Sequence, residues 1–569
     1  QSEHAGGADR HQFAFGTNST VVTDPLGTQR SYNFQIVQGF YRISSETQPA
    51  GSGHGAGSRS YTYDANANLA TRTDFLGNQT RYTYELARNL ETSRVEAYGA
   101  PQARTTTTSW HATFRLPLQV AEPLRITSYT YDAQGNMLTR TLQATNDANG
   151  SQGFAATPVG TPRTWTWTYS SPGQMLTADG PRTDVSDLTT YTYYPANDPD
   201  LGRRGNLAST TNALSQITNI TGYDAHGRPL TITDPNGLTT TLAYDARGRL
   251  AARSADGETT SYQYDGVGQL TRVTLPDGSY LAYTYDAAQR LAGVADNLGN
   301  SIAYTLDAMG NRTREEVRDP ASQLTQLRQR VFDALSRLAQ DIGAASQTTA
   351  YAYDANGNVT SVTDPLSHAT TSAYDALNRL IRTTDPTGGQ INYAYNGQDQ
   401  LTQVTDPRNL ATTYAVDGLG NVTTQVSPDT GTTQSVYDAA GNLTSRSDAK
   451  GQSTTYQYDA LNRVTLVTHA DGSQVRTTYD LGTNGIGRVR LIEELTGGNV
   501  TASIQYGYDA LGRVTSEARA LAGVVHTTTY GYANGRLASV TYPSGRRIDY
   551  THDGLGRISQ IPLTDNGQV

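Results

Sequence analysis

The sequence predicts an all-β protein in which one long antiparallel sheet of repeated β-hairpins is coiled into a hollow shell. The first observation is a tyrosine-aspartate phrase that returns mostly every 21 residues, which is the signature of a repeat architecture. The second is the composition, because 37 tyrosines and abundant threonine and valine favour strands and are not typical of disordered chains. The third is that the expected strands carry polar residues on both faces.

The repeated unit begins with the tyrosine-aspartate pair or a variant of it, with Asp or Asn as the second residue. The first residues of these units are Tyr223, Tyr244, Tyr264, Tyr285, Leu306, Phe332, Tyr353, Tyr374, Tyr395, Val416, Tyr437, Tyr458, Tyr479 and Tyr508. Earlier copies begin at Tyr63, Tyr84 and Tyr131, and irregular stretches separate them. The sequence therefore predicts one continuous array without a separate catalytic domain: decorated repeats over residues 1–222, then regular repeats over residues 223–569.

A few steps of the repeat are longer than the others. The steps into Phe332, Tyr508 and Tyr532 contain extra residues, and we expect loops to absorb them. Residues 322–338 carry leucines near helical spacing, but their second half aligns with the repeat. We interpret this stretch as a repeat with a long turn and not as a helix.

Each unit contains two turns and two strands. One turn has Asp385 at its first position, Pro386 at its second and Gly388 at its fourth, which are the preferences of a type I β-turn. The other turn follows the tyrosine-aspartate pair, as after Tyr353 and Asp354. Short runs with alternating faces lie between the turns, as in strands. The unit is therefore predicted to be a β-hairpin, and consecutive hairpins are predicted to pair edge to edge.

Acidic and basic residues recur four positions apart across the turn that follows the tyrosine. These turn residues are Tyr223, Asp224 and Arg228; Tyr244, Asp245 and Arg249; Tyr374, Asp375 and Arg379; Tyr458, Asp459 and Arg463; and Asp509 with Arg513. So many equivalent pairs exclude a catalytic interpretation, because chemistry needs one site. We interpret them as turn braces, each contributing about 0–1 kcal/mol when exposed. We expect no catalytic residue, no cofactor and no metal ligand.

The number of strands constrains the architecture. About two dozen hairpins supply roughly fifty strands, far beyond the ~10 that an open twisted sheet tolerates before it curls or splits. A sandwich would need a dry face of large apolar residues. Tyrosine instead suits a wall that is wet on both faces, because its ring packs while its hydroxyl stays hydrated. We therefore expect a coil around a polar, solvent-filled interior.

Several local motifs match known sites, but the repeat explains them. Residues 429–432 spell the aspartic-protease tetrad, which would need a second carboxylate, and they fall in a turn. Residues 354–358 resemble the start of a calcium loop without its distal Glu. The glycine-rich stretch 51–57 lacks the P-loop lysine, so we expect a flexible loop. Trp165 and Trp167 share one strand face, and packing is favoured over stacking on a sugar.

Charge and apolar runs exclude several classes of protein. The net charge is -9 and the basic residues are scattered, so no footprint for nucleic acid is found. No run of 18 apolar residues predicts a membrane span, and the absence of cysteine excludes a disulfide framework. The chain begins with Gln1 and shows no leader, and repeat-like sequence continues toward Val569. We therefore expect it to be processed or to be a piece of a longer protein.

The whole phrase is Tyr-Asp-Ala-x-Gly-Asn/Arg-Leu, then threonine-rich residues and Asp-Pro-x-Gly. Over roughly residues 13–560 it resembles the RHS or YD-repeat family, which includes bacterial Rhs polymorphic toxins, the B and C components of Tc toxin complexes and the shell of teneurins. The resemblance implies a β-strand cocoon that encloses a C-terminal toxin polypeptide. The family's capping core segment, which cleaves itself through aspartates, is not recognisable here, so the resemblance assigns neither autoproteolysis nor toxicity to any residue.

Two classes of function remain open. The favoured one is the encapsulating shell of a secreted toxin, whose partners would be other segments of a larger polypeptide, namely a cap and a cargo, or a delivery machine. The alternative is a bacterial cell-surface or fibre-forming protein that mediates adhesion or binds carbohydrate. Either class places the protein outside the cell. An enzyme is not favoured, because no polar cluster outside the repeat stands out. Expressed alone, such an array is expected to aggregate or to pair end to end through its unpaired strand edges.

The hairpin assignment predicts a far-ultraviolet circular dichroism spectrum dominated by strand. Helix should stay below about 10%, against about a third in an ordinary globular domain. A spectrum with substantial helix would contradict the hairpin assignment.

Overall fold

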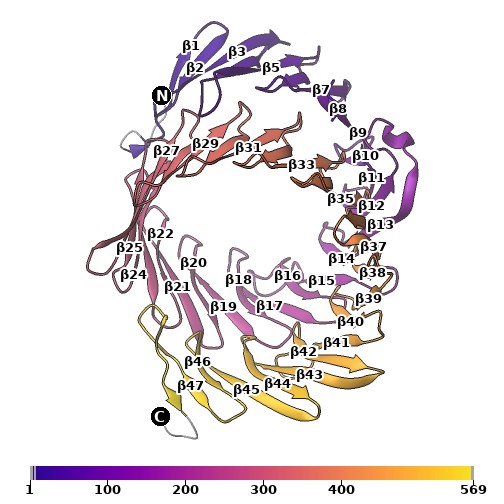
Figure 1. The fold of residues 1–569 in the computed structure, drawn as a ribbon, viewed down its shortest axis with the longest axis vertical. Helices are drawn as coiled ribbons and strands as arrows, with labels where there is room; N and C mark the ends of the chain where they lie inside the picture. The colour runs from indigo at the N-terminus through magenta and orange to yellow at the C-terminus, as the bar shows by residue number, and fades with distance from the viewer. Residues whose placement is uncertain (1–3, 6–7, 565–569) are drawn as a thin grey trace. The chain divides into compact units, whose positions relative to one another are not determined.

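The protein consists of β-strands and the turns and short connections that join them (Figure 1). The computed structural model describes residues 4–5 and 8–564, and within them 48 strands form one antiparallel sheet and two short strands pair separately. Helical structure in this part of the chain is limited to short 3-10 turns such as η2 (Gly153–Ala155). None of the described residues form a helix with the length and apolar character needed to cross a membrane. The predicted fold class, an antiparallel sheet of repeated β-hairpins, is confirmed.

The chain divides into two compact units, each built from two tiers of strands. Unit 1 comprises Gln1–Arg163, Thr284–Gly293 and Asn300–Thr432, and unit 2 comprises Thr164–Tyr283, Val294–Gly299 and Thr433–Val569. We call residues 12–163 and 300–432 the first and second tiers of unit 1, and residues 164–283 and 433–564 the first and second tiers of unit 2. The terminal residues Gln1 and Val569 lie outside the described residues.

The strands up to residue 285 are short, and most contain five to nine residues. The strands of residues 12–163 are β1 (Gln12–Phe15), β2 (Ser19–Thr23), β3 (Gln29–Val37), β4 (Phe40–Gln48), β5 (Gly57–Tyr63), β6 (Leu69–Thr73), β7 (Gln79–Glu85), β8 (Leu90–Tyr98), β9 (Arg104–Trp110), β10 (Pro117–Glu122), β11 (Arg125–Tyr131) and β12 (Met137–Thr145). Those that follow are β13 (Pro158–Tyr169), β14 (Met175–Asp179), β15 (Thr189–Tyr193), β16 (Leu207–Thr211), β17 (Ile217–Tyr223), β18 (Pro229–Thr233), β19 (Thr239–Tyr244), β20 (Leu250–Ala255), β21 (Glu258–Tyr264), β22 (Leu270–Thr274) and β23 (Tyr280–Tyr285).

The remaining strands carry the regular repeat. They begin with β24 (Leu291–Asp296), β25 (Ser301–Leu306), β26 (Arg312–Arg318), β27 (Leu324–Phe332), β28 (Leu338–Ile342), β29 (Thr348–Tyr353), β30 (Val359–Thr363), β31 (Ala369–Tyr374), β32 (Leu380–Thr384), β33 (Gln390–Tyr395), β34 (Leu401–Thr405), β35 (Ala411–Val416), β36 (Val422–Ser427) and β37 (Gly431–Tyr437). They end with β38 (Leu443–Ser447), β39 (Ser453–Tyr458), β40 (Val464–Thr468), β41 (Gln474–Tyr479), β42 (Val489–Thr496), β43 (Asn499–Tyr508), β44 (Val514–Leu521), β45 (Val524–Ala533), β46 (Arg536–Thr541), β47 (Arg547–Asp549), β48 (Thr551–His552), β49 (Ile558–Gln560) and β50 (Leu563–Thr564).

The two turns of each sequence repeat have the same backbone geometry. In the turn from Asp385 to Gly389, which we call a DP turn, the N–H of Gly388 donates to the carbonyl of Asp385 at 3.0 Å, and the N–H of Asp385 donates to the carbonyl of Gly389 at 2.9 Å. Gly388 has φ 90°, the left-handed conformation that closes a type I turn with a bulge. The turn after the tyrosine, which we call a YD turn, repeats these bonds from Asp375 to Arg379.

Antiparallel pairing follows the chain from one strand to the next. Strand β31 pairs with β32, and β32 pairs with β33, with Arg382 opposite Ala373 on one side and Asn392 on the other. The register shifts by one residue beside Tyr374, which places a bulge next to the motif tyrosine. Bulges increase the local twist of a sheet, so a bulge that recurs with the repeat adds twist at regular intervals.

The longer steps of the repeat lengthen strands as well as turns. The step into Phe332 gives β26 and β27, joined by a short turn from Asp319 to Gln323. The step into Tyr532 gives β44 and β45, which are joined by two residues only. The expectation that loops absorb the extra residues, and that residues 322–338 contain a long turn, is wrong for these steps. The extra residues lie in longer paired strands, where their backbone N–H and C=O groups are hydrogen-bonded and no longer loop is needed.

The sheet is one layer thick within each unit, and it has no dry core. Among the described residues no large side chain is fully buried, and most of the buried apolar residues are small, such as Ala121 and Ala255. The strands contact chiefly the strands beside them in the sheet. Hydrogen bonding and half-buried tyrosines, and not a packed second sheet, therefore hold the structure.

The buried turn brace of the Tyr374 repeat should be more important for stability than an exposed one. The Asp375 side chain is 2% exposed and is held by Arg379, so Asp375→Ala removes the buried one of the two carboxylates that pair with this guanidinium, and with it the acceptor of two backbone N–H groups in the turn. We expect a loss of about 3 kcal/mol in the local free energy of opening, measured by hydrogen exchange of residues 370–400. Asp406→Ala, in an exposed DP turn, is the matched control and should have the smaller effect; equal effects would contradict the prediction.

Acid should weaken the braces together. The backbone N–H and the side chain of Arg249 hold the pKa of Asp245 below its ordinary value of 3.8, and Thr387 and Gly389 do the same for Asp385. A pKa that is lower in the folded state contributes stability that is complete above 3.8 and is lost as the pH falls through the folded value. The melting temperature should therefore stay constant from neutral pH down to about 3.8, the ordinary pKa of the aspartates, and should fall at lower pH. A melting temperature that rises in acid would contradict this sign.

Candidate functional site

The turn aspartate is the centre of each repeat. In the YD turn of the Tyr244 repeat, Oδ1 of Asp245 accepts the N–H groups of Arg247 and Arg249 at 2.9 and 3.0 Å. Its Oδ2 accepts Nε of Arg249 at 2.7 Å. One carboxylate thus satisfies two backbone donors inside the turn and holds the arginine that leaves it.

The arginine of one repeat also reaches the next repeat. The guanidinium of Arg379 lies over the ring of Tyr395, 5.1 Å from its centre, and its Nη1 donates to the carbonyl of Asn396 at 2.8 Å. The same stacking joins Arg228 to Tyr244, at 4.8 Å. Several YD turns that end in arginine are therefore attached to the following turn by a cation–π contact, and some of them by a hydrogen bond as well.

The motif tyrosines face backward along the chain. The hydroxyl of Tyr374 donates to the carbonyl of Val359 at 2.9 Å, and that of Tyr458 donates to the carbonyl of Leu443 at 2.8 Å. Burial raises the pKa of both hydroxyls, so they remain protonated donors. The expectation that the tyrosine hydroxyl stays hydrated is wrong for these residues, because it is bonded to the backbone of the preceding hairpin.

The structure places the predicted turn residues at equivalent points of this lattice, and it does not bring them together into one site. The bonded pairs are Tyr223 with the Leu207 carbonyl, Tyr353 with the Leu338 carbonyl, Asp224 with Arg228, Asp354 with Asn358, Asp375 with Arg379, and Asp459 with Arg463. Asp385, Pro386 and Gly388 form a DP turn, in which Oδ1 of the aspartate accepts two backbone N–H groups. These residues are parts of a wall.

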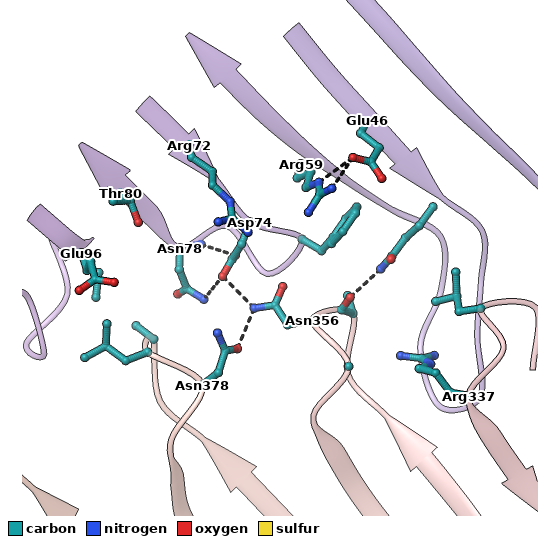
Figure 2. Close-up of a pocket in the computed structure, with 18 of the residues that line it drawn as sticks. Glu46, Arg59, Arg72, Asp74, Asn78, Thr80, Glu96, Arg337, Asn356 and Asn378 are labelled. Carbon is teal, nitrogen blue, oxygen red and sulfur yellow. Dashed lines mark hydrogen bonds and ion pairs between the residues drawn. The ribbon is translucent and has the colours of Figure 1, made fainter. Parts of the chain in front are cut away.

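Contacts between tiers form a second set that periodicity does not reveal. In unit 1 the DP turns of the first tier meet the YD turns of the second tier, 282 residues later for Asp74 and Asn356 (Figure 2). Oδ2 of Asp74 accepts Nδ2 of Asn356 at 2.7 Å and Nδ2 of Asn78 at 2.9 Å. Asn356 also donates to Asn378 of the next YD turn. We call this line of turn-to-turn contacts the seam.

The glycine-rich stretch belongs to the seam of unit 1. The N–H of Ser52 donates to Asp333 at 3.0 Å, and its hydroxyl donates to the carbonyl of Tyr351 at 2.5 Å. A Cβ on Gly53 would lie 2.8 Å from the backbone nitrogen of Tyr353, and Gly53 has φ 91°. The expected flexible loop is therefore wrong: the stretch is docked, and its glycines permit close approach.

Unit 2 has its own seam between its two tiers. Nη1 of Arg182 donates to the carbonyl of Asp459 at 2.5 Å and to Oδ1 of Asn462 at 3.3 Å. Further along, Asn236 exchanges hydrogen bonds with the backbone of Ile486, and Glu258 accepts Nη1 of Arg513. Asn236 and Asp459 occupy ordinary turn positions of the repeat, so the sequence pattern does not mark them as seam residues.

A polar hollow of about 480 Å³ lies in the seam of unit 1 (Figure 2). Glu46 in its lining accepts Nε and Nη2 of Arg59, and Glu96 accepts Nε of Arg104. Arg104 also donates to Asp399 of the second tier at 2.7 Å. Glu46 and Glu96 are thus engaged by arginines and Asp74 by two asparagines, so the hollow offers no free carboxylate pair for acid-base chemistry.

The other motifs lie in ordinary turns. Asp429 is in an exposed turn between β36 and β37, with its side chain 72% exposed, and Oδ1 of Asp354 accepts the N–H of Asn358. Within the described ranges, no group of three or more His, Cys, Asp or Glu side chains is arranged to hold a metal ion.

Solved structures share this fold at low sequence identity. They include a TcdB2-TccC3-TEV complex, with 15% identity and a TM-score of 0.54 over 98% of this chain and 30% of that chain. TcdB2-TccC3 without its hypervariable C-terminal region gives 12% identity and 0.57 over 97% and 34%, and the Photorhabdus luminescens Tc holotoxin pore gives 16% and 0.54 over 98% and 32%. This chain spans about a third of each. A search of curated proteins found no match.

The family model described as RHS Repeat matches the sequence ten times, so the predicted resemblance is confirmed. The matched residues are 223–259, 250–280, 264–296, 285–324, 332–369, 353–390, 374–410, 395–433, 437–474 and 531–565. With the hairpin lattice and the shared fold, these matches show that the chain belongs to the RHS-repeat family.

Proposed function

We propose that this chain is part of the wall of an Rhs-type encapsulating shell, which encloses a polypeptide cargo supplied by another segment of a larger protein. The observation that carries the proposal is the seam. In each unit it joins turns that are 250 to 307 residues apart, so neighbouring tiers are bonded edge to edge and do not merely lie close. A wall that holds a polypeptide needs such closure, whereas an extended fibre does not.

The chemistry of the sheet faces supports a container. Tyrosine, threonine and glutamine recur along the strands, interrupted by single exposed apolar residues such as Ile217, Leu281 and Val436, so a chain lying against the wall would meet a largely polar surface. Such a surface gives an enclosed polypeptide little apolar area to bind, and apolar burial is the main attraction between chains. The proposal therefore assigns the wall the task of confining its cargo without binding it tightly.

The proposal gives the predicted residues structural roles and leaves the chain without a catalytic residue. The turn residues of the Tyr223 to Tyr458 repeats brace the wall, with decorated repeats over residues 1–222 and regular ones over residues 223–569. Among solved structures of the same fold, one is named a Tc holotoxin pore. By analogy we place this chain in a secreted or surface-exposed bacterial toxin, with a cap, a cargo and a delivery machine as its partners.

Opening the seam of unit 2 should expose the cargo. The Arg182 side chain is 2% exposed, and it is the donor to both Asp459 and Asn462. Arg182→Ala should cost about 1–3 kcal/mol, because the Asp459 carbonyl and the Asn462 side chain on the second tier lose their buried donor. In the native gene product, limited proteolysis should then cleave a segment outside residues 1–569 that the unaltered protein protects.

Arg253→Ala is the matched control, because Arg253 is exposed on β20 of the same unit. It should leave protection unchanged. If no segment outside these residues is protected in the unaltered protein, the encapsulating role is wrong. In that case a surface or fibre role would have to be tested by adhesion.

A further inference from the structure

A second hollow, of about 500 Å³, lies in unit 2 between two neighbouring turns of the same tier. The DP turn from Asp448 to Gln452 lies on one side, and the turn from His469 to Ser473 lies on the other. The side chains that line it and matter for recognition are Arg446, Asp448, Gln452, Tyr456, His469 and Asp471. The floor is the face of β38 to β40, where Arg446 pairs with Thr454 and Tyr456 with Val467.

These side chains keep hydrogen-bonding capacity that is used elsewhere in the lattice. Oδ1 of Asp448 accepts the N–H groups of Lys450 and Gln452, and Oδ1 of Asp471 accepts the N–H of Ser473. Both aspartates line the hollow, and neither Oδ2 accepts a hydrogen bond within the part of the chain that the structure describes. The guanidinium of Arg446, on strand β38, and the ring of His469 have no hydrogen-bond partner among the described residues, although His469 interacts electrostatically with Asp471.

The repeat itself does not require this set of residues. The Tyr374 repeat, 63 residues earlier, has the same register, with Thr383 opposite Ile391 where this hollow has Arg446 opposite Thr454. The Tyr353 repeat has Ser372 at the place of Tyr456. Tyrosine at the place of Tyr456 is common in the array, as Tyr351 and Tyr393 show, whereas the hairpin does not require Arg446 or His469.

The turns around the hollow are also uncovered. In the first tier of unit 2 the DP turns are engaged by the second tier, as Asn236 is by Ile486 and Asp277 by Arg536. The turns at Asp448 and His469 make no bond to another tier within residues 4–5 and 8–564. Ligand atoms can therefore reach the free groups.

We propose that this hollow binds an uncharged saccharide. The hollow offers hydrogen-bond donors from Arg446, His469 and Gln452 and acceptors from two carboxylates. Because its positive and negative charges are close to balanced, the hollow does not favour a charged ligand. The ring of Tyr456, half-buried in the floor, supplies an apolar face with a polar edge. Alternating hydroxyls and C–H faces on a sugar match this combination, and the volume falls in the range of small-ligand sites.

The test replaces residues of the hollow by the residues that other repeats have at the same positions, so that the fold is preserved. Tyr456→Ser and Arg446→Thr introduce the side chains that the repeats at Tyr353 and Tyr374 already carry. Tyr393→Ser, at the place of Tyr456 in another repeat, is the matched control. Binding of lactose, maltose, cellobiose and chitobiose at millimolar concentrations is measured by saturation-transfer difference NMR, with circular dichroism to verify the fold.

We expect at least one of these disaccharides to bind the unaltered chain. The affinity should fall at least tenfold in Tyr456→Ser and in Arg446→Thr and should be unchanged in Tyr393→Ser. Absence of binding by all four disaccharides would overturn the proposal, as would binding that survives both substitutions or is lost equally in the control.

Discussion

In most turns of the array one carboxylate fixes the geometry on which the rest of the protein depends. Because Oδ1 of the turn aspartate accepts the N–H groups two and four residues on, the turn has one closed form, as Asp245 and Asp385 both show. A fixed turn sets the register of its hairpin, and a one-residue slip would move every side chain to the other face. The motif tyrosine therefore always lies where it can reach the carbonyl of the preceding hairpin.

This lattice also accounts for the near absence of lysine, of which Lys450 is the single example. Arg379 makes a forked pair with Asp375, lies over the ring of Tyr395 and donates to the Asn396 carbonyl. A planar guanidinium with five donors can make all three contacts at once, whereas an ammonium group is a compact point charge that cannot stack or fork. The repeat geometry selects arginine for its shape as much as for its charge.

The hairpins could be predicted from the sequence, because turn chemistry and strand alternation act within a few residues. The residue types at Asp385, Pro386 and Gly388 predict their turn without information about any distant part of the chain. The seam could not be predicted, because Arg182 and Asp459 are 277 residues apart and a 21-residue period says nothing about which turns meet. The fate of the tyrosine hydroxyl and the docking of Gly53 were missed for a related reason. Both depend on a neighbour, either the preceding hairpin or the other tier, that the local phrase does not identify.

The pairing of turns across the seam restricts how such a chain can change its length. Asn236 meets Ile486 after 250 residues, and Glu258 meets Arg513 after 255 residues. Loss of one hairpin between two such partners would carry every later turn past its counterpart by one unit, and donors would then face donors. Loss of a hairpin at an end of the array would remove only the pairings of that hairpin, such as that of Asn297 with the Gly554 carbonyl, and would leave the others in register. Lineages of this chain should therefore gain and lose whole hairpins at the ends, while extra residues in the interior are accommodated by longer strands, as in β44 and β45.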